Sequence, residues 1–352
     1  MTPASGRAAV LLAASFLTGE RATRSYSADL AVKLRGAGWK VLMTSSVPGR
    51  ALRALDIART IWRRRHDFDV AHVEVYSGAA FLWAELACLA LRWAAKPYIL
   101  SLRGGNLPGF AQRYPRRVKR MLRSAQAVIV PSGYLHEQMR PYRQDLTLVP
   151  NSLDVQAYPF RPRAQAKASL IWMRAFHGIY NPTLAARTLA LLEREFPDVR
   201  LQMIGPDMRD GSLGATARIS AEMGVAHRVH IHGPVPKGEV GQWLNRADIF
   251  LNTPTVDNTP VTVLEALACG LCVVSTNVGG LRHLLRHEYD ALLAPGGDAE
   301  SIAAAVRRVL LEPPLAQQLS RNGRKTAEQF AWSRTLPMWD QVLRTAARAG
   351  GA

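Results

Sequence analysis

The feature that most constrains this chain is a regular alternation of short apolar runs with longer amphipathic segments. Runs such as residues 70–76 and 199–204 are short and rich in β-branched or other apolar side chains. Such runs are typical of strands that are buried on both faces. Strands that alternate with helices predict an α/β architecture with parallel, doubly wound sheets, in which ligands bind beyond the carboxyl ends of the strands.

Length and composition accommodate two domains of this kind. The chain has 352 residues with a hydrophobic content of 48%, enough for two full cores. We expect one Rossmann-like domain at residues 1–155 and a second at 166–330. The segment 156–165 contains prolines and no apolar period, so it is predicted to be a linker. Residues 331–352 are predicted to form a last helix.

Cysteine usage and the long apolar segments bear on the compartment. Three cysteines argue against a disulfide framework and fit a reducing cytoplasm. Cys269 and Cys272 form a C-x-x-C pair, but they flank a helix end and a strand, and no second pair completes a zinc site. We interpret them as core residues. The apolar segment 8–17 is interpreted as a first buried strand rather than a signal peptide. The segment 79–102 is too interrupted by charges for a membrane span.

The net charge of +18 is concentrated in the first half of the chain. Residues 1–165 contain 25 Lys and Arg against 10 Asp and Glu, whereas residues 166–352 contain 20 against 17. A basic half could face nucleic acid, an anionic membrane or an anionic substrate. No nucleic-acid motif is present, which disfavours the first. The basic helical segments 51–65, with Trp62, and 116–123 suit an anionic lipid surface, or else are simply solvated.

Residues 257–270 form the most informative single segment. Pro260 suits a first helical turn and Gly270 suits a helix C-terminal cap. This arrangement places Asp257 before a helix N-terminus and Glu265 inside the helix. Free N–H groups and a partial positive charge make a helix N-terminus a natural site for a diphosphate. The two carboxylates beside it would suit sugar and ribose hydroxyls.

The segment reads Asp-Asn-Thr-Pro-Val-Thr-Val-Leu-Glu-Ala and resembles the acidic-x7-Glu motif of family 4 glycosyltransferases, usually Glu-Gly-x-Gly-Leu-x-x-Leu-Glu-Ala. Further landmarks of that family follow the same order along nearly the whole chain: Gly19, Pro150-Asn151-Ser152, Arg174, Gly205 and His232-Gly233. The resemblance implies the GT-B fold, with two Rossmann-like domains facing across a cleft. It assigns the acceptor to domain 1–155 and the sugar nucleotide to domain 166–330. It also implies that helix 331–352 crosses back to the first domain.

The resemblance further implies a retaining, metal-independent enzyme with no cofactor besides its nucleoside-diphosphate sugar. Asp257 and Arg174 would be catalytic, since Arg174 can grip the departing diphosphate and Asp257 can accept hydrogen bonds from sugar hydroxyls. Glu265 would bind the ribose. The other predicted donor-binding residues are Gly205, Gly233, Pro234, Val235, Asn258, Thr259 and Thr262.

The chain departs from the family pattern at two positions. Ile179 stands where a second diphosphate-binding lysine is usual, so His177, another basic group, or Arg174 with the helix amides must replace it. His177 is alternatively an ordinary loop residue. Arg103 stands where many members have histidine, and a guanidinium cannot act as a base. Retaining members are thought to let the leaving phosphate take the acceptor proton. We therefore predict that Arg103, Gly19 and Asn106 bind the acceptor or a phosphate.

The predicted function is transfer of a sugar, of hexosyl or N-acetylhexosaminyl type, from a nucleoside-diphosphate sugar to a glycan or lipid-linked acceptor. Such a reaction belongs to polysaccharide or glycoconjugate biosynthesis. We expect it in the cytoplasm, with the protein peripheral at the inner face of the membrane and no nucleic-acid partner. The alternatives are a sugar-nucleotide epimerase or hydrolase on the same fold, and a catalytically silent scaffold that binds sugar nucleotides or glycans.

Overall fold

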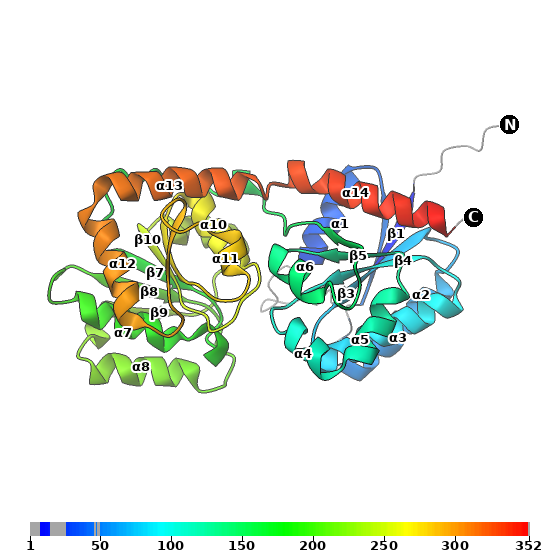
Figure 1. Cartoon of the computed structure of the whole chain (residues 1–352), viewed down its shortest axis with the longest axis horizontal. Coiled ribbons are helices and arrows are strands. Elements are labelled where there is room, and N and C mark those ends of the chain that lie inside the picture. The colour runs from blue at the N-terminus through cyan, green and yellow to red at the C-terminus, as the bar shows by residue number, and fades with distance from the viewer. Residues whose placement is uncertain (1–7, 15–25, 46, 48–49, 351–352) are drawn as a thin grey trace. The chain divides into compact units, whose positions relative to one another are not determined.

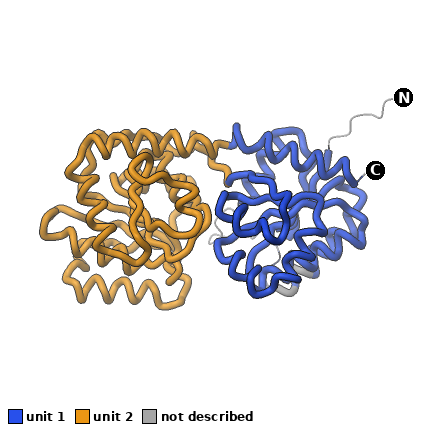
Figure 2. Tube along the Cα trace, in the orientation of Figure 1, with its two compact units in different colours: residues 1–150, 332–352 blue, residues 151–331 orange. Residues whose placement is uncertain are grey.

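The computed structural model describes residues 8–14, 26–45, 47 and 50–350 (Figure 1). The chain divides into two compact units (Figure 2). Unit 1 comprises Met1–Pro150 and Trp332–Ala352, and unit 2 comprises Asn151–Ala331. Each unit has one six-stranded sheet in which every pair of neighbouring strands is parallel, so the predicted doubly wound α/β class is confirmed.

The sheet of unit 1 has the strand order β2-β1-β3-β4-β5-β6. Along strand β1, successive side chains point to opposite faces of the sheet and pack into two different hydrophobic cores. Val10 and Leu12 pack into the core that contains Trp339, whereas Leu11 packs into the core that contains Phe81. Burial on both faces is what a parallel sheet requires. The strands are β1 (Ala9–Ala13), β2 (Lys40–Thr44), β3 (Val70–Val75), β4 (Tyr98–Leu102), β5 (Ala127–Val130) and β6 (Leu146–Leu148).

Helices cover both faces of this sheet. Two of them, α1 (Tyr26–Gly36) and α14 (Trp332–Ala349), contribute to the core on one face. The helices on the other face are α2 (Arg50–Arg63), α3 (Ala79–Trp93), α4 (Leu107–Arg113), α5 (Pro115–Arg123) and α6 (Gly133–Met139). The short helix α4 was not predicted, because Pro108 and Gly109 lie inside it and resemble loop residues.

The sheet of unit 2 has the order β12-β11-β10-β7-β8-β9. Its strands are β7 (Ser169–Met173), β8 (Arg200–Ile204), β9 (Val229–His232), β10 (Ile249–Asn252), β11 (Cys272–Thr276) and β12 (Ala291–Ala294). In their own sequence this is the order 3-2-1-4-5-6 of the dinucleotide-binding fold. The edge strand β12 was not predicted, because its four residues Ala-Leu-Leu-Ala carry no β-branched side chain.

Helices likewise cover both faces of the second sheet. The α-helices are α7 (Pro182–Leu192), α8 (Ser212–Glu222), α9 (Val240–Leu244), α10 (Val261–Cys269), α11 (Leu281–Leu284), α12 (Ala299–Leu311) and α13 (Pro313–Glu328). Four 3₁₀ turns complete the unit: η1 (Val155–Ala157), η2 (Gly178–Tyr180), η3 (Ala226–Arg228) and η4 (Lys237–Glu239). Helices α7 and α12 pack on one face, and α9, α10 and α11 on the other.

The last helix, α14, is fixed to unit 1 by aromatic residues. Trp332 stacks on Tyr26 with ring centroids 5.7 Å apart. Trp339 is fully buried, and its Nε1 donates to the Tyr26 hydroxyl at 3.2 Å. Trp39 of unit 1 also donates to Asp340 at 2.7 Å. These contacts explain why residues 332–352 group with a unit that lies far earlier in the sequence.

The segment 156–165 is part of unit 2, which corrects the predicted linker. Tyr158 and Arg163 are buried in it. Arg163 donates to the carbonyl oxygen of Ala247 at 2.8 Å and lies 3.4 Å from the Asp248 carboxylate. Its backbone N–H also donates to Ser320 at 3.1 Å. Despite its prolines, this segment packs against the rest of unit 2 and does not link the two units. The boundary between the units falls at residue 150.

All three cysteines are buried and free, so the interpretation of Cys269 and Cys272 as core residues is confirmed. Among the residues that the structure describes, no helix combines the length and apolar composition needed to cross a bilayer.

Candidate functional site

The strand order of unit 2 reverses between β7 and β10, and open α/β sheets bind ligands at such a reversal. Arg174 is the first residue after β7, and the loop from β10 to α10 carries Asp257. The two side chains, far apart in the sequence, therefore meet at the carboxyl ends of adjacent strands. The topology alone selects this position as the candidate site.

Arg174 and Asp257 form a close ion pair. Arg174 Nη2 donates to Asp257 Oδ2 at 2.5 Å, and Nη1 donates to Thr262 Oγ1 at 3.3 Å. The guanidinium also lies 4.0 Å from the ring centroid of Tyr180. The Arg174 and Asp257 side chains are only 11% and 14% exposed. The pair is thus largely shielded from water, and charge-assisted hydrogen bonds are strong in such surroundings.

Three glycines allow the backbone around this pair to approach closely. A Cβ at Gly205 would lie 1.9 Å from the carbonyl oxygen of Arg174. A Cβ at Gly279 would lie 2.2 Å from the carbonyl oxygen of Asp257, and one at Gly280 would lie 2.1 Å from that of Asn258. No larger residue fits without displacing the loop. Glycine at these three positions therefore permits the close approach of the main-chain segments that carry the ion pair.

Glu265 is buried within helix α10 and is not a solvated surface residue, since it is only 5% exposed. The hydroxyl of Tyr158 donates to its Oε1 at 2.7 Å. Burial raises the pKa of Glu265 above its ordinary value of 4.5, while the Tyr158 hydrogen bond and the charges of Lys237 and Arg174 oppose that rise. A buried carboxylate with one oxygen oriented by a tyrosine is a ready acceptor for ligand hydroxyls.

The start of helix α10 lies between the two carboxylates. Pro260 is its N-cap residue, so it precedes the first turn rather than occupying it as predicted. Asp257 is not the cap: its Oδ1 accepts from the backbone of Asn258 at 2.8 Å. Gly270 ends the helix with a φ of 79°, as predicted. The first N–H groups of a helix have no intrahelical partner and can bind an anion.

The remaining predicted donor residues occupy neighbouring loops. Asn258 and Thr259 are buried in the loop before α10. Gly233 and Pro234 are exposed after β9, and Val235 packs on the hydrophobic core that contains Val263. A Cβ at Gly233 would meet no atom within 4 Å, so no crowding requires glycine there.

His177 lies in the loop after β7, where its Nδ1 accepts from the backbone of Ile179 at 3.1 Å. It is also 3.9 Å from Asp210. These contacts make it the cap of turn η2, which favours the ordinary loop interpretation. Ile179 itself uses its carbonyl oxygen to accept from the backbone of Thr255 at 2.8 Å. This contact joins the β7 loop to the loop that carries Asp257.

Unit 1 presents a different group of residues. Arg103 follows β4 and is buried, with its guanidinium 4.1 Å from the Tyr26 ring centroid and its Nε 3.8 Å from Glu74. Ser27 also donates to Glu74 at 2.7 Å. Asn106 is exposed at the N-cap of α4. Gly19, the third predicted acceptor residue, lies outside the described residues.

Strand β3 also carries a buried histidine, which was not among the predicted site residues. His72 is fully buried on β3, and among the described residues neither ring nitrogen has a hydrogen-bond partner. Its ring meets that of Trp339 edge-on at 5.1 Å. Burial, with the nearby Arg103 charge, lowers the pKa of His72 to about 3. The ring is therefore neutral under ordinary conditions.

Sequence reasoning also missed Tyr158, Tyr180 and the Gly279-Gly280 pair as site residues. Tyr158 lies in the segment interpreted as a linker, so nothing suggested that its hydroxyl meets Glu265. The glycine pair follows strand β11, and this position at the carboxyl end of a strand could have identified it. Within the described ranges, no group of three or more His, Cys, Asp or Glu side chains is placed to hold a metal ion.

Family models match both halves of the chain. The model for group 1 glycosyl transferases matches residues 163–326, and the model for glycosyltransferase family 4 matches residues 16–157. Together these matches reach into both units and include the Arg174, Asp257 and Glu265 positions. The chain belongs to the family 4 glycosyltransferases.

Solved structures share the fold of the whole chain. Sucrose-phosphate synthase from Thermosynechococcus elongatus superposes with a TM-score of 0.80 at 18% identity, covering 97% of this chain and 100% of that one. Anabaena HepE in complex with UDP gives 0.78 at 15% identity, covering 96% and 100%. At these identities the likeness establishes the fold, which is the predicted GT-B fold with two Rossmann-like units.

Curated relatives include enzymes named D-inositol 3-phosphate glycosyltransferase. The protein of Thermobispora bispora is 28% identical over 193 residues, which are 50% of this chain and 45% of the relative. That of Arthrobacter sp. strain FB24 is 26% identical over 301 residues, 80% of this chain and 71% of the relative. The chain thus spans less than half of the first relative and about seven-tenths of the second.

Proposed function

We propose that this protein is a retaining, metal-independent glycosyltransferase that moves a sugar from a nucleoside-diphosphate sugar to a glycan or lipid-linked acceptor. The observation that carries the proposal is the Arg174–Asp257 pair at the β7/β10 reversal, with Glu265 buried on the following helix. One cation, one helix N-terminus and two carboxylates are the groups that a sugar nucleotide needs. HepE, which shares the fold, is described in complex with UDP-glucose.

In this proposal Arg174 and the first N–H groups of α10 bind the diphosphate. The bond between the sugar C1 and the diphosphate oxygen breaks, and negative charge grows on that oxygen. A largely buried guanidinium that is already held in position stabilises such charge without having to reorganise. Because Arg174 is already aligned by Thr262 and Tyr180, little conformational entropy remains to be lost.

The two carboxylates have separate roles in the proposal. Asp257 accepts hydrogen bonds from donor-sugar hydroxyls and offsets positive charge that develops on the sugar ring. Glu265 accepts hydrogen bonds from the ribose hydroxyls. The hydroxyl of Tyr158 donates to Oε1 of Glu265 and so orients this carboxylate. The acceptor oxygen then bonds to C1 on the face that the diphosphate leaves, and its proton passes to the departing phosphate. No side chain has to act as a base, which is consistent with arginine at position 103.

The donor is proposed to supply a hexosyl or N-acetylhexosaminyl group, and the acceptor to bind unit 1. Arg103 suits a phosphate or carboxylate on the acceptor, because its guanidinium is held by Tyr26 and Glu74. The curated relatives are named for an acceptor that carries a phosphate. The proposed role is in polysaccharide or glycoconjugate synthesis.

Turnover of labelled nucleoside-diphosphate sugars, with a crude lipid or oligosaccharide extract as acceptor, tests the proposal. We expect label to move from one donor into the extract, and we expect Arg174→Ala to slow the transfer roughly 10²–10³-fold. Label that returns as an isomeric sugar nucleotide would indicate an epimerase. Free labelled sugar would indicate a hydrolase, and binding without turnover would indicate a scaffold.

A further inference from the structure

Helix α3 of unit 1 is apolar on its outer side as well as on its inner side. Its inner side chains, such as Phe81 and Leu91, are buried in the core. Four large apolar side chains are nevertheless exposed at a spacing that aligns them along the helix: Leu82, Leu86, Leu89 and Trp93. A helix that is hydrophobic all round is normally covered by something. The exposed stripe therefore indicates a binding surface.

Helix α2 extends this apolar stripe. It packs beside α3 and exposes Leu52, Leu55 and Trp62. Scattered exposed apolar residues need no explanation, but two stripes on adjacent helices form a patch. Trp93 is 75% exposed at the end of α3, which is extreme for so large an apolar side chain.

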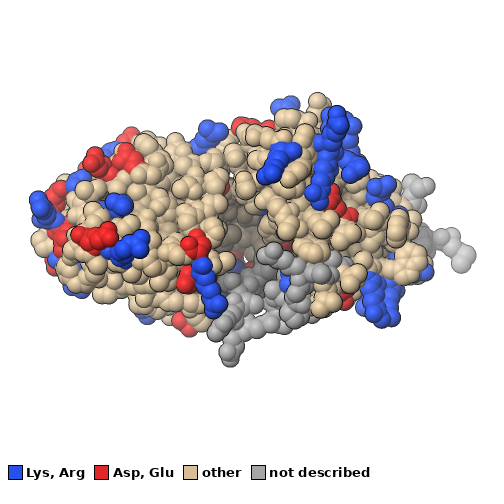
Figure 3. All heavy atoms as spheres, turned by 90° about the horizontal axis from the view of Figure 1, so that it is seen from below, with Lys and Arg blue, Asp and Glu red and all other residues tan. Residues whose placement is uncertain are grey.

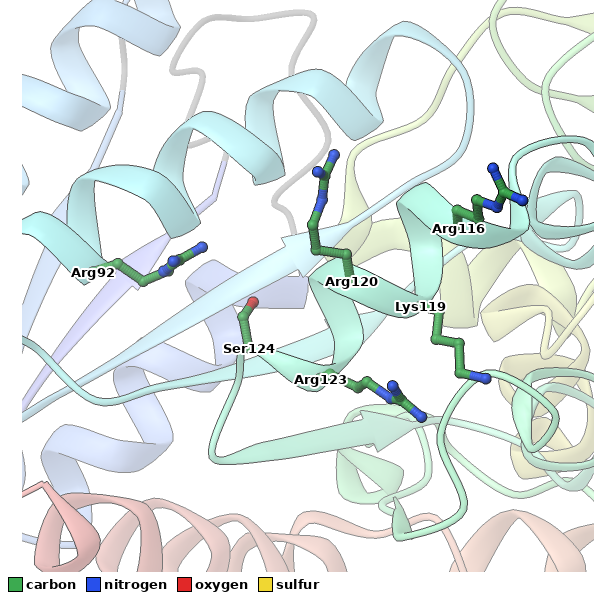
Figure 4. Close-up of a pocket in the computed structure, with 6 residues that line it drawn as sticks. All are labelled: Arg92, Arg116, Lys119, Arg120, Arg123 and Ser124. Atoms are coloured by element: carbon green, nitrogen blue, oxygen red, sulfur yellow. The ribbon is translucent and has the colours of Figure 1, made fainter.

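Cations border this patch. A shallow hollow has no carboxylate among the described residues that line it, and five basic side chains from the end of α3 and from α5 do line it: Arg92, Arg116, Lys119, Arg120 and Arg123 (Figure 4). Figure 3 also shows Lys and Arg gathered in clusters on unit 1, with mostly uncharged surface and a few Asp and Glu side chains between them. The one acidic side chain of α3, Glu85, is neutralised by Arg117, whose Nε donates to it at 2.7 Å.

The combination of an apolar stripe and a cationic border indicates which kind of partner this surface binds. A second copy of this chain would bring its own like-charged border against the first. A soluble anion would use the cations and leave the exposed leucines and tryptophans in water. An anionic bilayer satisfies both, because phosphates meet the basic side chains while Trp and Leu enter the boundary between headgroups and acyl chains.

We propose that the face of unit 1 formed by α2, α3 and α5 docks on a membrane of anionic phospholipids. Trp93 and the α3 leucines insert at the interface, and the cations of α5 bind the lipid phosphates. This surface is separate from the Arg174 site, and its test does not require sugar transfer.

The test is co-sedimentation of the full chain with vesicles of phosphatidylcholine alone or mixed with phosphatidylglycerol, at several salt concentrations. We expect binding to the mixed vesicles only. A Lys119→Gln/Arg123→Gln variant should bind roughly 30-fold more weakly and with a shallower salt dependence, since each basic residue near an anionic surface contributes about 1 kcal/mol. Trp93→Ser should weaken binding at every salt concentration and leave the salt dependence unchanged.

Matched controls come from unit 2. Arg187→Gln/Arg194→Gln removes two exposed charges, and Leu311→Ser removes an apolar side chain that is 67% exposed. Both controls should bind vesicles as the unmodified chain does. Equal loss in these controls, equal binding to neutral vesicles, or no binding at all would overturn the proposal. So would a dimer in sedimentation velocity without lipid that Trp93→Ser converts to monomer, because a second copy would then cover this face.

Discussion

Each unit has a six-stranded parallel sheet, but the two sheets differ in strand order, and the units differ in charge and in what lies at the carboxyl ends of their strands. Unit 1 has 26 Lys and Arg against 10 Asp and Glu, whereas unit 2 has 19 against 17. In unit 2 the ends of β7 and β10 bring Arg174 together with Asp257. In unit 1 the ends of β3 and β4 bring Arg103 to Glu74 and Tyr26, above a neutral buried histidine.

This difference indicates that the two units bind different kinds of ligand. The charges of unit 2 nearly balance, and its site holds one cation between acidic groups, as a ligand with both phosphates and hydroxyls requires. The excess charge of unit 1 lies largely outside its strand ends, on α2 and α5. A parallel sheet therefore fixes the edge at which ligands bind, while side chains at the strand ends and on the outer helices decide which ligands bind.

Removing the cation of the unit 2 site should have the largest effect on sugar transfer. Arg174→Ala should reduce the rate of sugar transfer roughly 10²–10³-fold, the usual effect of removing one group that stabilises charge in a transition state. Arg174→Lys should recover only part of this, because an ammonium cannot make two parallel hydrogen bonds. Steady-state kinetics with the donor measures the effect. Arg218→Ala, on an exposed face of the same unit, should change nothing, and an equal loss there would exclude a special role for Arg174.

Acid should destabilise the protein through the buried histidine of unit 1. The unfolded chain takes up a proton on His72 near its ordinary pKa of 6.5, but the folded chain does so only near 3. Between these values the unfolded state holds more protons, so stability falls as the pH falls. The loss should be about 1.4 kcal/mol per pH unit, or about 2 kcal/mol between pH 6.5 and 5.

Guanidinium unfolding of the unmodified chain and of His72→Leu at pH 7 and pH 5 measures this loss. The variant should lose about 2 kcal/mol less over that interval. His227→Leu, which removes an exposed histidine of unit 2, should retain the full loss. Identical pH dependence in all three proteins would show that His72 is protonated without cost.

The hydroxyl of Tyr158 orients the buried carboxylate of the unit 2 site. Tyr158→Phe removes the 2.7 Å hydrogen bond to Glu265 and so raises the pKa of that carboxyl further above 4.5. Nucleotide affinity should fall about 5–10-fold, equivalent to about 1–1.4 kcal/mol for one hydrogen bond. Isothermal titration calorimetry should also show proton release or uptake that depends more strongly on pH. Unchanged affinity would mean that Glu265 needs no positioning by Tyr158.

The smallest expected effect on the donor comes from unit 1. Arg103→Gln should leave nucleotide affinity unchanged within a factor of about two, because uncoupled sites usually add within about 0.5 kcal/mol. It should raise the KM for the acceptor. A drop in nucleotide affinity instead of acceptor affinity would contradict the division of work between the units.

Much of the fold could be predicted from the sequence, because the alternation of apolar runs with amphipathic segments indicates directly which residues are buried. Strands β3 and β8 lie within the apolar runs 70–76 and 199–204 that predict them, and each differs from its run by one residue at one end. The edge strand β12 and helix α4 were not predicted, because such short elements are stabilised by tertiary packing more than by their local sequence pattern. The Arg174–Asp257–Glu265 arrangement was accessible because each residue belongs to a motif. Tyr158 and Tyr180 were not, because they reach the site only through tertiary packing.

The most direct test of the central claim is a thermal-shift titration with UDP, GDP, ADP and their common sugar conjugates, on the unmodified chain and on Glu265→Ala, with Glu265→Gln as a check on folding. At one hundred times its dissociation constant, a true donor should add about 2.7 kcal/mol of stability. We predict a shift with the nucleotides of one base only, which Glu265→Ala abolishes. A shift that persists in Glu265→Ala, or no shift with any nucleotide, would contradict a donor site built on Arg174, Asp257 and Glu265.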